Sequence, residues 1–524
     1  MNRRDFLAGS ALSLGIAGAA SPPAVGLARS APVQGAARPL RLMMFDTESL
    51  AERSQAEVVP PPLKKLGILI EPDSPGDAGG VSTAMGCGFT RDERGRLRLY
   101  YTGYSKPARN SAICIAESDD AIHWTKPALG QVKIDGIDTN RLEIRGLPEG
   151  VTATQPSLVR APDGSWRLYF WAIGGKLRVL RYVAANSPDG LHWKVVDFAA
   201  PCLKHLLELS PKYSWAWLDG PESQKVWAEL GGKALPDFLA LKWAKSNDAT
   251  HTYASPGGGF EMFSVWPLPN RPGSGRRVEP DNSKEMVRCI HRRTSDDGLR
   301  WSDPELVLVP DGADPWDQQF YYLSQHHLTE WRIGFLGSYR IVAQDMNVEM
   351  VCSRDGRRWH RPMRGAWVPR GPKGSVDSVR IYMPSHLVDR QKDWLCLYTG
   401  FDTRHDQDAA SGRQAIHGLE IPRYRFAGLA PRNSLTARIR TNPFILPGTA
   451  VKIDAAVAGE LRAELCDAFG KPLPGLTIAD CVPFAGDSEA HVLKWKNAGT
   501  ADYQYDAVSL RLEWEGGTVY SVFA

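Results

Sequence analysis

The sequence predicts an all-β protein, namely a five-bladed β-propeller followed by a C-terminal β-sandwich. The 524 residues include 49 Gly, 38 Pro and 17 Trp, a composition that favours many short strands joined by turns. A motif with the pattern S-x-D-G-x-x-W occurs four times, once with Ala in place of Gly. After residue 425 this motif stops, and short runs of alternating apolar and polar residues take its place.

The four motifs predict hairpins that organise the propeller. They begin at Ser118, Ser187, Ser295 and Ser353, and each follows an apolar run typical of a strand. Asp-Gly after a strand makes a tight turn, because Gly tolerates positive φ and Asp caps the turn. We expect the motif Asp to be structural, since it recurs in every copy, and the motif Trp to pack the outer strand onto its neighbour. Units of three or four strands cannot bury both faces alone, so they stack around an axis.

The spacing of the repeats predicts the domain boundaries. We place the propeller at 39–425, with an insertion around 200–285, because the motif tryptophans Trp193 and Trp301 are unusually far apart. A larger sialidase-type propeller is the alternative, but its similar box carries one more residue between Asp and Gly. Period-2 alternation over 426–524 predicts the β-sandwich.

The N-terminus, residues 1–38, predicts a twin-arginine export signal and a flexible lead-in. Arg3 and Arg4 precede Phe6 and a weakly apolar run, which ends in small residues typical of a cleavage site. No later stretch approaches the roughly 20 apolar residues that cross a bilayer. We therefore expect an exported protein, periplasmic or extracellular, without a membrane span.

Charge and cysteine usage narrow the possible partners. A net charge of +4 is too balanced for an electrostatic nucleic-acid binder. The eight cysteines show no C-x-x-C spacing and no His at ligand spacing, so no metal site and no cofactor is expected. Cys466 and Cys481 are the one pair considered for a disulfide. The sequence does not predict an oligomeric state.

The propeller and sandwich together resemble glycoside hydrolases of families 32, 43 and 68, and most closely secreted family 32-like proteins; the propeller phosphorylases are more distant. The shared segments lie at 314–321, 374–378 and 479–487. The resemblance implies an exported glycosidase that cleaves a plant, algal or microbial oligo- or polysaccharide. Fructosidase-type members carry an acidic residue where this chain has Gln155, which cannot ionise and is therefore a candidate only for binding a sugar hydroxyl.

Carboxylates near the inner strands are the candidates for catalysis, because glycoside hydrolysis usually needs two carboxyls that flank the scissile bond. Asp317 and Asp377 precede predicted inner strands, and Glu349 lies between apolar residues, where a charge is costly unless it lines a cavity. We predict these three as catalytic residues. The candidates for substrate binding are Asp314, Gln155, Tyr321, His326, Arg380, Arg404, His405 and Glu261.

Other acidic residues and other functions stay open at this point. Glu71 and Asp73 are expected near the rim of the propeller, and Asp219 and Glu222 lie in the insertion. Turn formation by Asp314 and Asp317, or an exposed outer-strand position for Glu349, would explain those residues without catalysis. The alternative functions are a non-catalytic carbohydrate-binding propeller and a glycosyl-transferring, phosphorolytic or lyase activity on the same scaffold.

Overall fold

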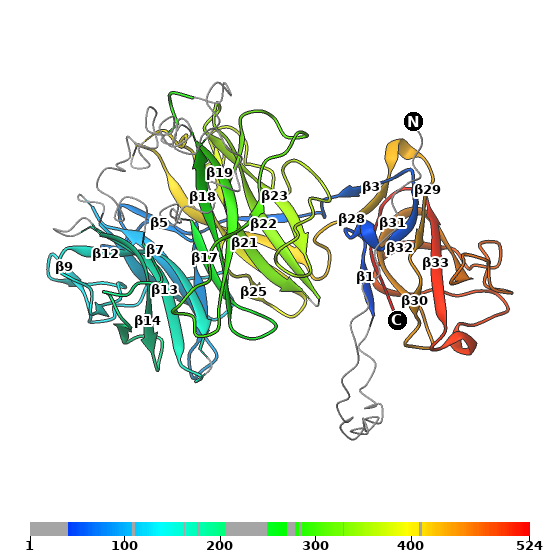
Figure 1. Ribbon diagram of the computed structural model, residues 1–524, viewed down its shortest axis with the longest axis horizontal. Coiled ribbons are helices and arrows are strands. Elements are labelled where there is room, and N and C mark those ends of the chain that lie inside the picture. The colour runs from blue at the N-terminus through cyan, green and yellow to red at the C-terminus, as the bar shows by residue number, and fades with distance from the viewer. Residues whose placement is uncertain are drawn as a thin grey trace, which may run out of the picture. The chain divides into compact units, whose positions relative to one another are not determined.

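The computed structural model describes residues 40–106, 110–161, 163–174, 179–204, 249–269, 278–281, 286–328, 330–407 and 411–524. The regular structure of these residues is almost entirely β-strand (Figure 1), and their helical elements are the 3-10 turns η1 (Thr47–Ser49), η3 (Arg432–Ser434) and η4 (Ala501–Tyr503). No helix in these ranges is long and apolar enough to cross a membrane. The predicted export signal, Asp219 and Glu222 lie outside the described residues.

The first antiparallel group of strands surrounds a central aromatic strand. It contains β5 (Gly80–Ser82), β6 (Gly88–Arg91), β7 (Leu97–Tyr104) and β8 (Ser111–Ser118). β5 and β6 both pair with β7 along one edge, and β8 pairs along the other edge. Side chains on both faces of β7 are buried, as a strand between two neighbouring blades requires. A short ribbon follows, formed by β9 (Lys133–Ile134) and β10 (Ile137–Asp138).

The second and third groups repeat this pattern. The second contains β11 (Ile144–Arg145), β12 (Val151–Arg160), β13 (Trp166–Gly174), β14 (Val179–Ser187), β15 (Trp193–Val195) and β16 (Leu203–Lys204). The third contains β17 (Thr250–Ala254), β18 (Phe260–Pro269), β19 (Met286–Ser295) and β20 (Glu305–Leu308). β12–β13–β14 and β17–β18–β19–β20 are successive antiparallel neighbours, which is the meander of a propeller blade.

The remaining propeller strands share one hydrogen-bonded sheet. Its members are β21 (Gln318–Leu328), β22 (Trp331–Arg340), β23 (Asp345–Ser353), β24 (Arg380–Tyr382), β25 (Val388–Asp389), β26 (Asp393–Phe401), β27 (Gln414–Pro422) and β4 (Lys64–Ile70). β21–β22–β23 form one meander, and β24, β26, β27 and β4 form a second. A single parallel pair, between Met346 and Arg380, joins the two meanders.

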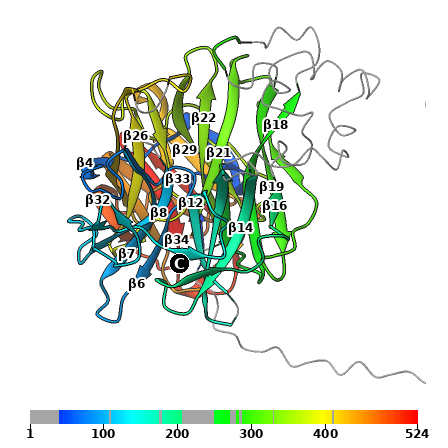
Figure 2. The ribbon, with the colours of Figure 1, turned by 90° about the vertical axis from the view of Figure 1, so that its left-hand side faces the viewer.

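These groups close into a ring. β12 contacts β7 and β8 of the first group, and β18 contacts β21 (Figure 2). β17 contacts both β12 and β21. β23 contacts β24, and β27 contacts β5, so the last meander meets the first group. The chain also supplies the outermost strand of the last meander, β4, from before the first group. The all-β propeller prediction is confirmed, whereas the number of five blades stays a prediction.

The motif hairpins have the turn geometry that the sequence predicts. In every copy, the backbone N–H of the Gly position donates to the motif Ser hydroxyl at 2.8 Å. The motif Asp accepts backbone N–H groups two and three residues further along the chain. These bonds hold the pKa of the Asp120 and Asp297 carboxyls well below their usual range. The motif Asp residues therefore serve their own turns.

Two hairpins also bind the preceding group of strands. The Tyr100 hydroxyl in β7 donates to the Gly190 carbonyl at 2.6 Å, and the Tyr169 hydroxyl in β13 donates to the Gly298 carbonyl at 2.9 Å. Both glycines occupy the fourth position of the motif and have positive φ angles of 75° and 71°. The motif therefore closes its own turn and anchors one group of strands to the next.

A separate ten-stranded antiparallel sheet carries the second main core. It contains β1 (Arg41–Met43), β2 (Leu50–Ser54), β3 (Ala56–Val59), β28 (Gly428–Pro431), β29 (Ala437–Thr441), β30 (Phe444–Ile445), β31 (Lys452–Asp467), β32 (Phe484–Val492), β33 (Ala507–Trp514) and β34 (Thr518–Phe523). β1 pairs with β34, β2 with β29 and β3 with β28. Residues 41–59 thus lie in the C-terminal sheet, although they precede the propeller strands in the sequence.

Candidate functional site

The innermost strands define two ends of the propeller. We call the end where β5, β12, β17, β21 and β24 begin the entrance end, and the opposite end the exit end. Because the innermost strands run in the same direction, their first residues gather at the entrance end and their last residues at the exit end. A ligand site at either end is built from several groups of strands at once.

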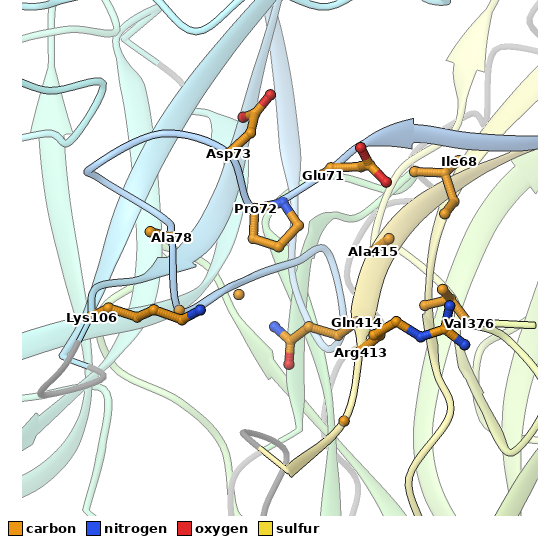
Figure 3. A pocket seen from close by; sticks show the side chains of 13 residues that line it. Ile68, Glu71, Pro72, Asp73, Ala78, Lys106, Val376, Arg413, Gln414 and Ala415 are labelled. Atoms are coloured by element: carbon orange, nitrogen blue, oxygen red, sulfur yellow. The ribbon is translucent and has the colours of Figure 1, made fainter.

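A hollow at the entrance end, which we call the rim hollow, has a volume of about 640 Å³. This is within the range of pockets that hold small ligands. The hollow is formed by the segment after β4, the beginning of β5, the loop after β7 and the beginning of β27. Its lining residues are Ile68, Glu71, Pro72, Asp73, Ala78, Gly79, Gly80, Lys106, Val376, Gly412, Arg413, Gln414 and Ala415 (Figure 3).

The polar side chains of the rim hollow carry charges of both signs. Lys106 and Gln414 extend toward one another from opposite sides (Figure 3). Asp73 forms an ion pair with Lys126, which also contacts the buried carboxylate of Asp77 at 2.7 Å. Glu71 is exposed, and within the described residues its carboxylate has no ion pair. Among the residues that the structure describes, the hollow thus combines the ion-paired carboxylate of Asp73 and the carboxylate of Glu71 with hydrogen-bond donors.

Two of the donors are held in place by hydrogen bonds to a neighbouring carboxylate and to backbone carbonyls. The Arg413 Nε donates to Asp402 at 2.8 Å, and its Nη2 donates to the Gly374 carbonyl at 2.6 Å. The Gln414 Nε2 donates to the Val81 carbonyl at 3.1 Å, which ties β27 to β5. Because Arg413 and Gln414 are fixed, they can orient a ligand rather than follow it.

Asp377 lies directly after Val376 of the rim hollow but is enclosed by its own partners. It accepts hydrogen bonds from Lys65 at 2.6 Å, the Tyr398 hydroxyl at 2.8 Å and the Ser375 hydroxyl at 2.8 Å, and it is 5% exposed. Burial favours the protonated form, but the bonds from Lys65, Ser375 and Tyr398 outweigh it and hold the pKa of Asp377 below its usual range.

The other two predicted catalytic carboxylates are also closed by cations. Asp317 accepts from the Arg340 Nε at 2.8 Å. Glu349, in β23, accepts from Arg361 at 2.6 and 2.8 Å, and the same guanidinium binds Asp314 through two bonds of 2.7 Å. Burial raises the pKa of Glu349 in spite of this pairing. The structure brings Glu349 and Asp314 together, because both bind Arg361. Asp317 and Asp377 do not share this cation: Asp317 binds Arg340, and Asp377 binds Lys65.

Tyr321 and His405 meet in a second polar cluster near the beginning of β21. The Tyr339 hydroxyl donates to Asp281 at 3.1 Å, so at 3.3 Å it accepts the Nδ1–H of His405. The His405 Nε2 then accepts the Tyr321 hydroxyl at 2.9 Å. Burial and the nearby cation Arg288 lower the pKa of His405 to about 3, which keeps its imidazole neutral at physiological pH.

The three further entrance-end candidates have structural partners. Arg380 donates to the Thr403 carbonyl at 2.7 Å. Gln155 has a φ of 57°, and its side-chain oxygen accepts the Ala249 N–H at 3.1 Å, which connects β12 to the beginning of β17. Arg404 is exposed and forms an ion pair with Asp406.

The last two candidates, Glu261 and His326, do not share the surroundings of the rim hollow. Glu261 is fully buried and accepts from Arg332 at 2.9 Å, Gln325 at 2.8 Å and His327 at 3.3 Å. His326 lies edge-on to the Trp394 ring, with the ring centroids 4.2 Å apart. Both residues belong to the exit end, because Gln325, His326 and His327 lie near the end of β21.

Sequence reasoning placed Glu71 and Asp73 near the rim but did not identify Lys106, Arg413 or Gln414. Arg413 and Gln414 stand where the chain leaves the blade-five loop and begins the next strand, β27. Two polar residues at the beginning of a strand were the sequence signal that could have identified them. In the described residues, no group of three His, Cys, Asp or Glu has the arrangement of a metal site. All eight cysteines are free, so the Cys466–Cys481 pair is not a disulfide.

No family of known sequences and no curated protein matches the chain. Solved structures similar to it include a glycoside hydrolase, with 12% identity over 70% of this chain and 93% of that chain and a TM-score of 0.45. Another is an N-acetylgalactosamine deacetylase from F. plautii in complex with blood group B trisaccharide, with 14% identity over 71% and 97% and a TM-score of 0.42. A third is a glycosyl hydrolase from Bacteroides ovatus, with 12% identity over 67% and 90% and a TM-score of 0.39.

Proposed function

We propose that the protein is an exported glycoside hydrolase that acts on an oligo- or polysaccharide bound in the rim hollow. The observation that carries this proposal is the presence of two carboxylates, Glu71 and Asp73, in a hollow of about 640 Å³. In contrast, Asp317, Asp377 and Glu349 are each buried against a cation, whereas the Asp73 side chain stays 70% exposed in spite of its ion pair with Lys126. The Arg3-Arg4 signal supports export, and the reaction needs no cofactor.

The two rim carboxylates suit different roles in hydrolysis. Glu71 has no ion pair among the described residues, so it is free to give a proton to the glycosidic oxygen and to take one back. Asp73 is balanced by Lys126 and stays available as the carboxylate that activates water or attacks the sugar carbon. Lys106 and Gln414 supply donors for sugar hydroxyls from the two walls.

The test is release of reducing sugar from a panel of neutral plant, algal and microbial glycans. Because general acid–base catalysis contributes about 10²- to 10⁴-fold, we expect Glu71→Gln and Asp73→Asn each to lower kcat at least about a hundredfold. Circular dichroism confirms that each variant folds. The matched controls are Asp317→Asn and Asp377→Asn, which remove the sequence-predicted acids.

The controls separate the two possible sites. Full activity of Glu71→Gln and Asp73→Asn, together with loss of activity in Asp317→Asn and Asp377→Asn, would move the reaction away from the rim hollow. The same assay with inorganic phosphate distinguishes a phosphorylase, which releases a sugar phosphate instead of a reducing sugar.

A non-catalytic carbohydrate-binding propeller is the second candidate. The closure of Asp317, Asp377 and Glu349 by cations favours it, because none of these carboxylates is then positioned to exchange a proton with a substrate. This function predicts saturable glycan binding without release of reducing sugar or sugar phosphate from any member of the panel.

A further inference from the structure

A second hollow, which we call the exit hollow, opens at the opposite end of the propeller and has a volume of about 410 Å³. Its lining comes from the ends of the innermost strands: Phe89 from β6, Arg160 from β12, Tyr253 from β17, His327 from β21 and His386 from the segment before β25. Since every group of strands contributes, the exit hollow lies on the axis around which they are arranged.

The exit hollow continues into a neighbouring hollow. A further cavity of about 410 Å³ shares Phe89, Arg160, Trp166 and Leu387 with it. Two adjoining hollows with a common wall form a groove longer than a single sugar unit, and we call this the exit groove. Phe89 and Trp166, which are both partly exposed, supply aromatic surface at the common wall, and the Arg160 guanidinium lies over the Trp166 ring, 3.9 Å from its centroid.

Two of the three histidines that line the exit hollow, His327 and His386, use one ring nitrogen within the protein and leave the other for a ligand. The His386 Nδ1 lies 3.1 Å from the Cys87 carbonyl, which can only accept, so Nδ1 carries the hydrogen and Nε2 is an acceptor. The His327 Nε2 likewise donates to the Glu261 carboxylate at 3.3 Å, which leaves Nδ1 as the nitrogen that can bond to a ligand. Burial lowers the pKa of His386 to about 4, so this ring is uncharged near neutral pH.

Among the described residues, no carboxylate lines the exit hollow, and the one that lines the neighbouring hollow, Asp389, is paired with Arg423 at 2.7 and 3.1 Å. The buried carboxylate of Glu261, which contacts His327 of the lining, is bound by His327, Gln325 and two guanidinium groups. The acid–base pair that glycoside hydrolysis requires is therefore missing from this wall, and the hollow suits binding without reaction.

We propose that the exit groove is an accessory binding site for a neutral saccharide chain, separate from the rim hollow. Hydroxyl groups of the sugar donate to the His386 Nε2 and form a hydrogen bond with the His327 Nδ1. The apolar faces of the sugar rings lie against Phe89 and Trp166, whose aromatic surfaces form the common wall. This inference does not require the rim hollow to be catalytic.

The experiment is calorimetric titration of the full chain with pentasaccharides and polymers of xylan, arabinan and β-glucan, and with anionic polygalacturonate as the charged comparator. A Glu71→Gln background limits turnover during the titration. We expect binding of a neutral glycan, and we expect Trp166→Ala and His386→Ala each to weaken it about tenfold or more. Phe469→Ala, which removes a 94% exposed ring in the turn after β31, is the control that leaves affinity unchanged.

Two readouts separate this proposal from that of the rim hollow. Trp166→Ala and His386→Ala should leave kcat on short soluble substrates unchanged while they weaken binding to the polymer. Unchanged polymer affinity in both variants, with thermal unfolding confirming their fold, overturns the exit groove. Preference for polygalacturonate over every neutral glycan also overturns it, because the Arg160 guanidinium, which lines both hollows, would then carry the binding in place of the imidazoles and the aromatic wall.

Discussion

Glu261 illustrates why a buried carboxylate resembles a catalytic residue in the sequence. An acid between apolar neighbours is costly unless it lines a cavity or is paired, and the sequence alone does not distinguish these cases. In the structure the carboxylate binds Arg292, Arg332 and His327, so pairing satisfies it. Its position also fixes the ring of His327, which lines the exit hollow.

We expect the pairing of Glu261 to make stability depend on pH. Burial opposes ionisation, but the bonds from His327 and Arg332 lower the pKa of Glu261 from an ordinary 4.5 to about 2. The stabilisation is therefore complete above about pH 4.5 and is lost as pH falls toward 2. Glu261→Gln should cost about 3 kcal/mol near pH 7, measured by urea unfolding, because it leaves two buried guanidinium groups without their carboxylate.

The difference between wild type and Glu261→Gln should shrink as the unfolding experiment is repeated from pH 6 down to pH 3. Glu330→Gln is the control, because Glu330 forms an exposed ion pair with Arg354 and its side chain is 71% exposed. Its effect should stay within about 1 kcal/mol. A pH-independent difference for Glu261→Gln would show that its charge does not carry the stabilisation.

At the level of the element, the motif hairpin both closes a tight turn and contacts the preceding group of strands, and each of these two roles restricts its glycine in a different way. The turn requires a positive φ, and the preceding group of strands requires space above the glycine. At Gly298 a Cβ atom would lie 2.2 Å from the Tyr169 hydroxyl and 2.9 Å from the Arg167 Nη1. The first copy carries Ala121 at this position, with a φ of 66°, so the positive φ alone is tolerated.

We expect Gly298→Ala to be far more destabilising than an alanine at a glycine that requires only the positive φ. Gly164 has a φ of 81° and nothing within 4 Å of a Cβ, and it provides the matched control. Gly164→Ala should cost about 1 kcal/mol, and Gly298→Ala about 3 kcal/mol, because the clash with Tyr169 adds to the backbone strain. If Gly298→Ala and Gly164→Ala shifted the midpoint of chemical unfolding equally, the contact of Gly298 with Tyr169 of the preceding group of strands would not contribute to stability.

At the scale of the whole molecule, local signals predicted the repeating units but not their closure. The motif hairpins mark the outer strands because turn chemistry depends on adjacent residues. In contrast, the pairing of β4 with β27 and of β1–β3 with the C-terminal sheet joins segments hundreds of residues apart, for which no local pattern exists.

The candidate site was harder to predict for the same reason. Strand heads with carboxylates were visible in the sequence, but Asp377 is closed by Lys65, which is 312 residues away. Whether an acid faces a cation or an open hollow depends on such distant neighbours. The rim acids Glu71 and Asp73 follow β4, so their place at the hollow depends on β4 joining β27 as the outermost strand.

The pairing of β4 with β27 predicts which strands lose protection first when the packing of β4 is weakened. Ile70 is buried at the end of β4, opposite Ile416 of β27, in a core shared with Val81 of β5. Ile70→Ala should cost about 2–5 kcal/mol through the cavity it leaves. Because the lost packing lies where the last meander meets the first group, hydrogen exchange should accelerate in β4, β27 and β5 and much less in β18 and β19.

Ile290→Ala is the matched control for this opening. Ile290 is fully buried in β19, within a different core that includes Phe263, Phe320 and Leu336. Hydrogen exchange measured by mass spectrometry should then accelerate in β18–β22 while β4 and β27 stay protected. If both variants accelerated exchange uniformly over the ring, the propeller would open as a single unit and the junction of β27 with β5 would have no separate stability.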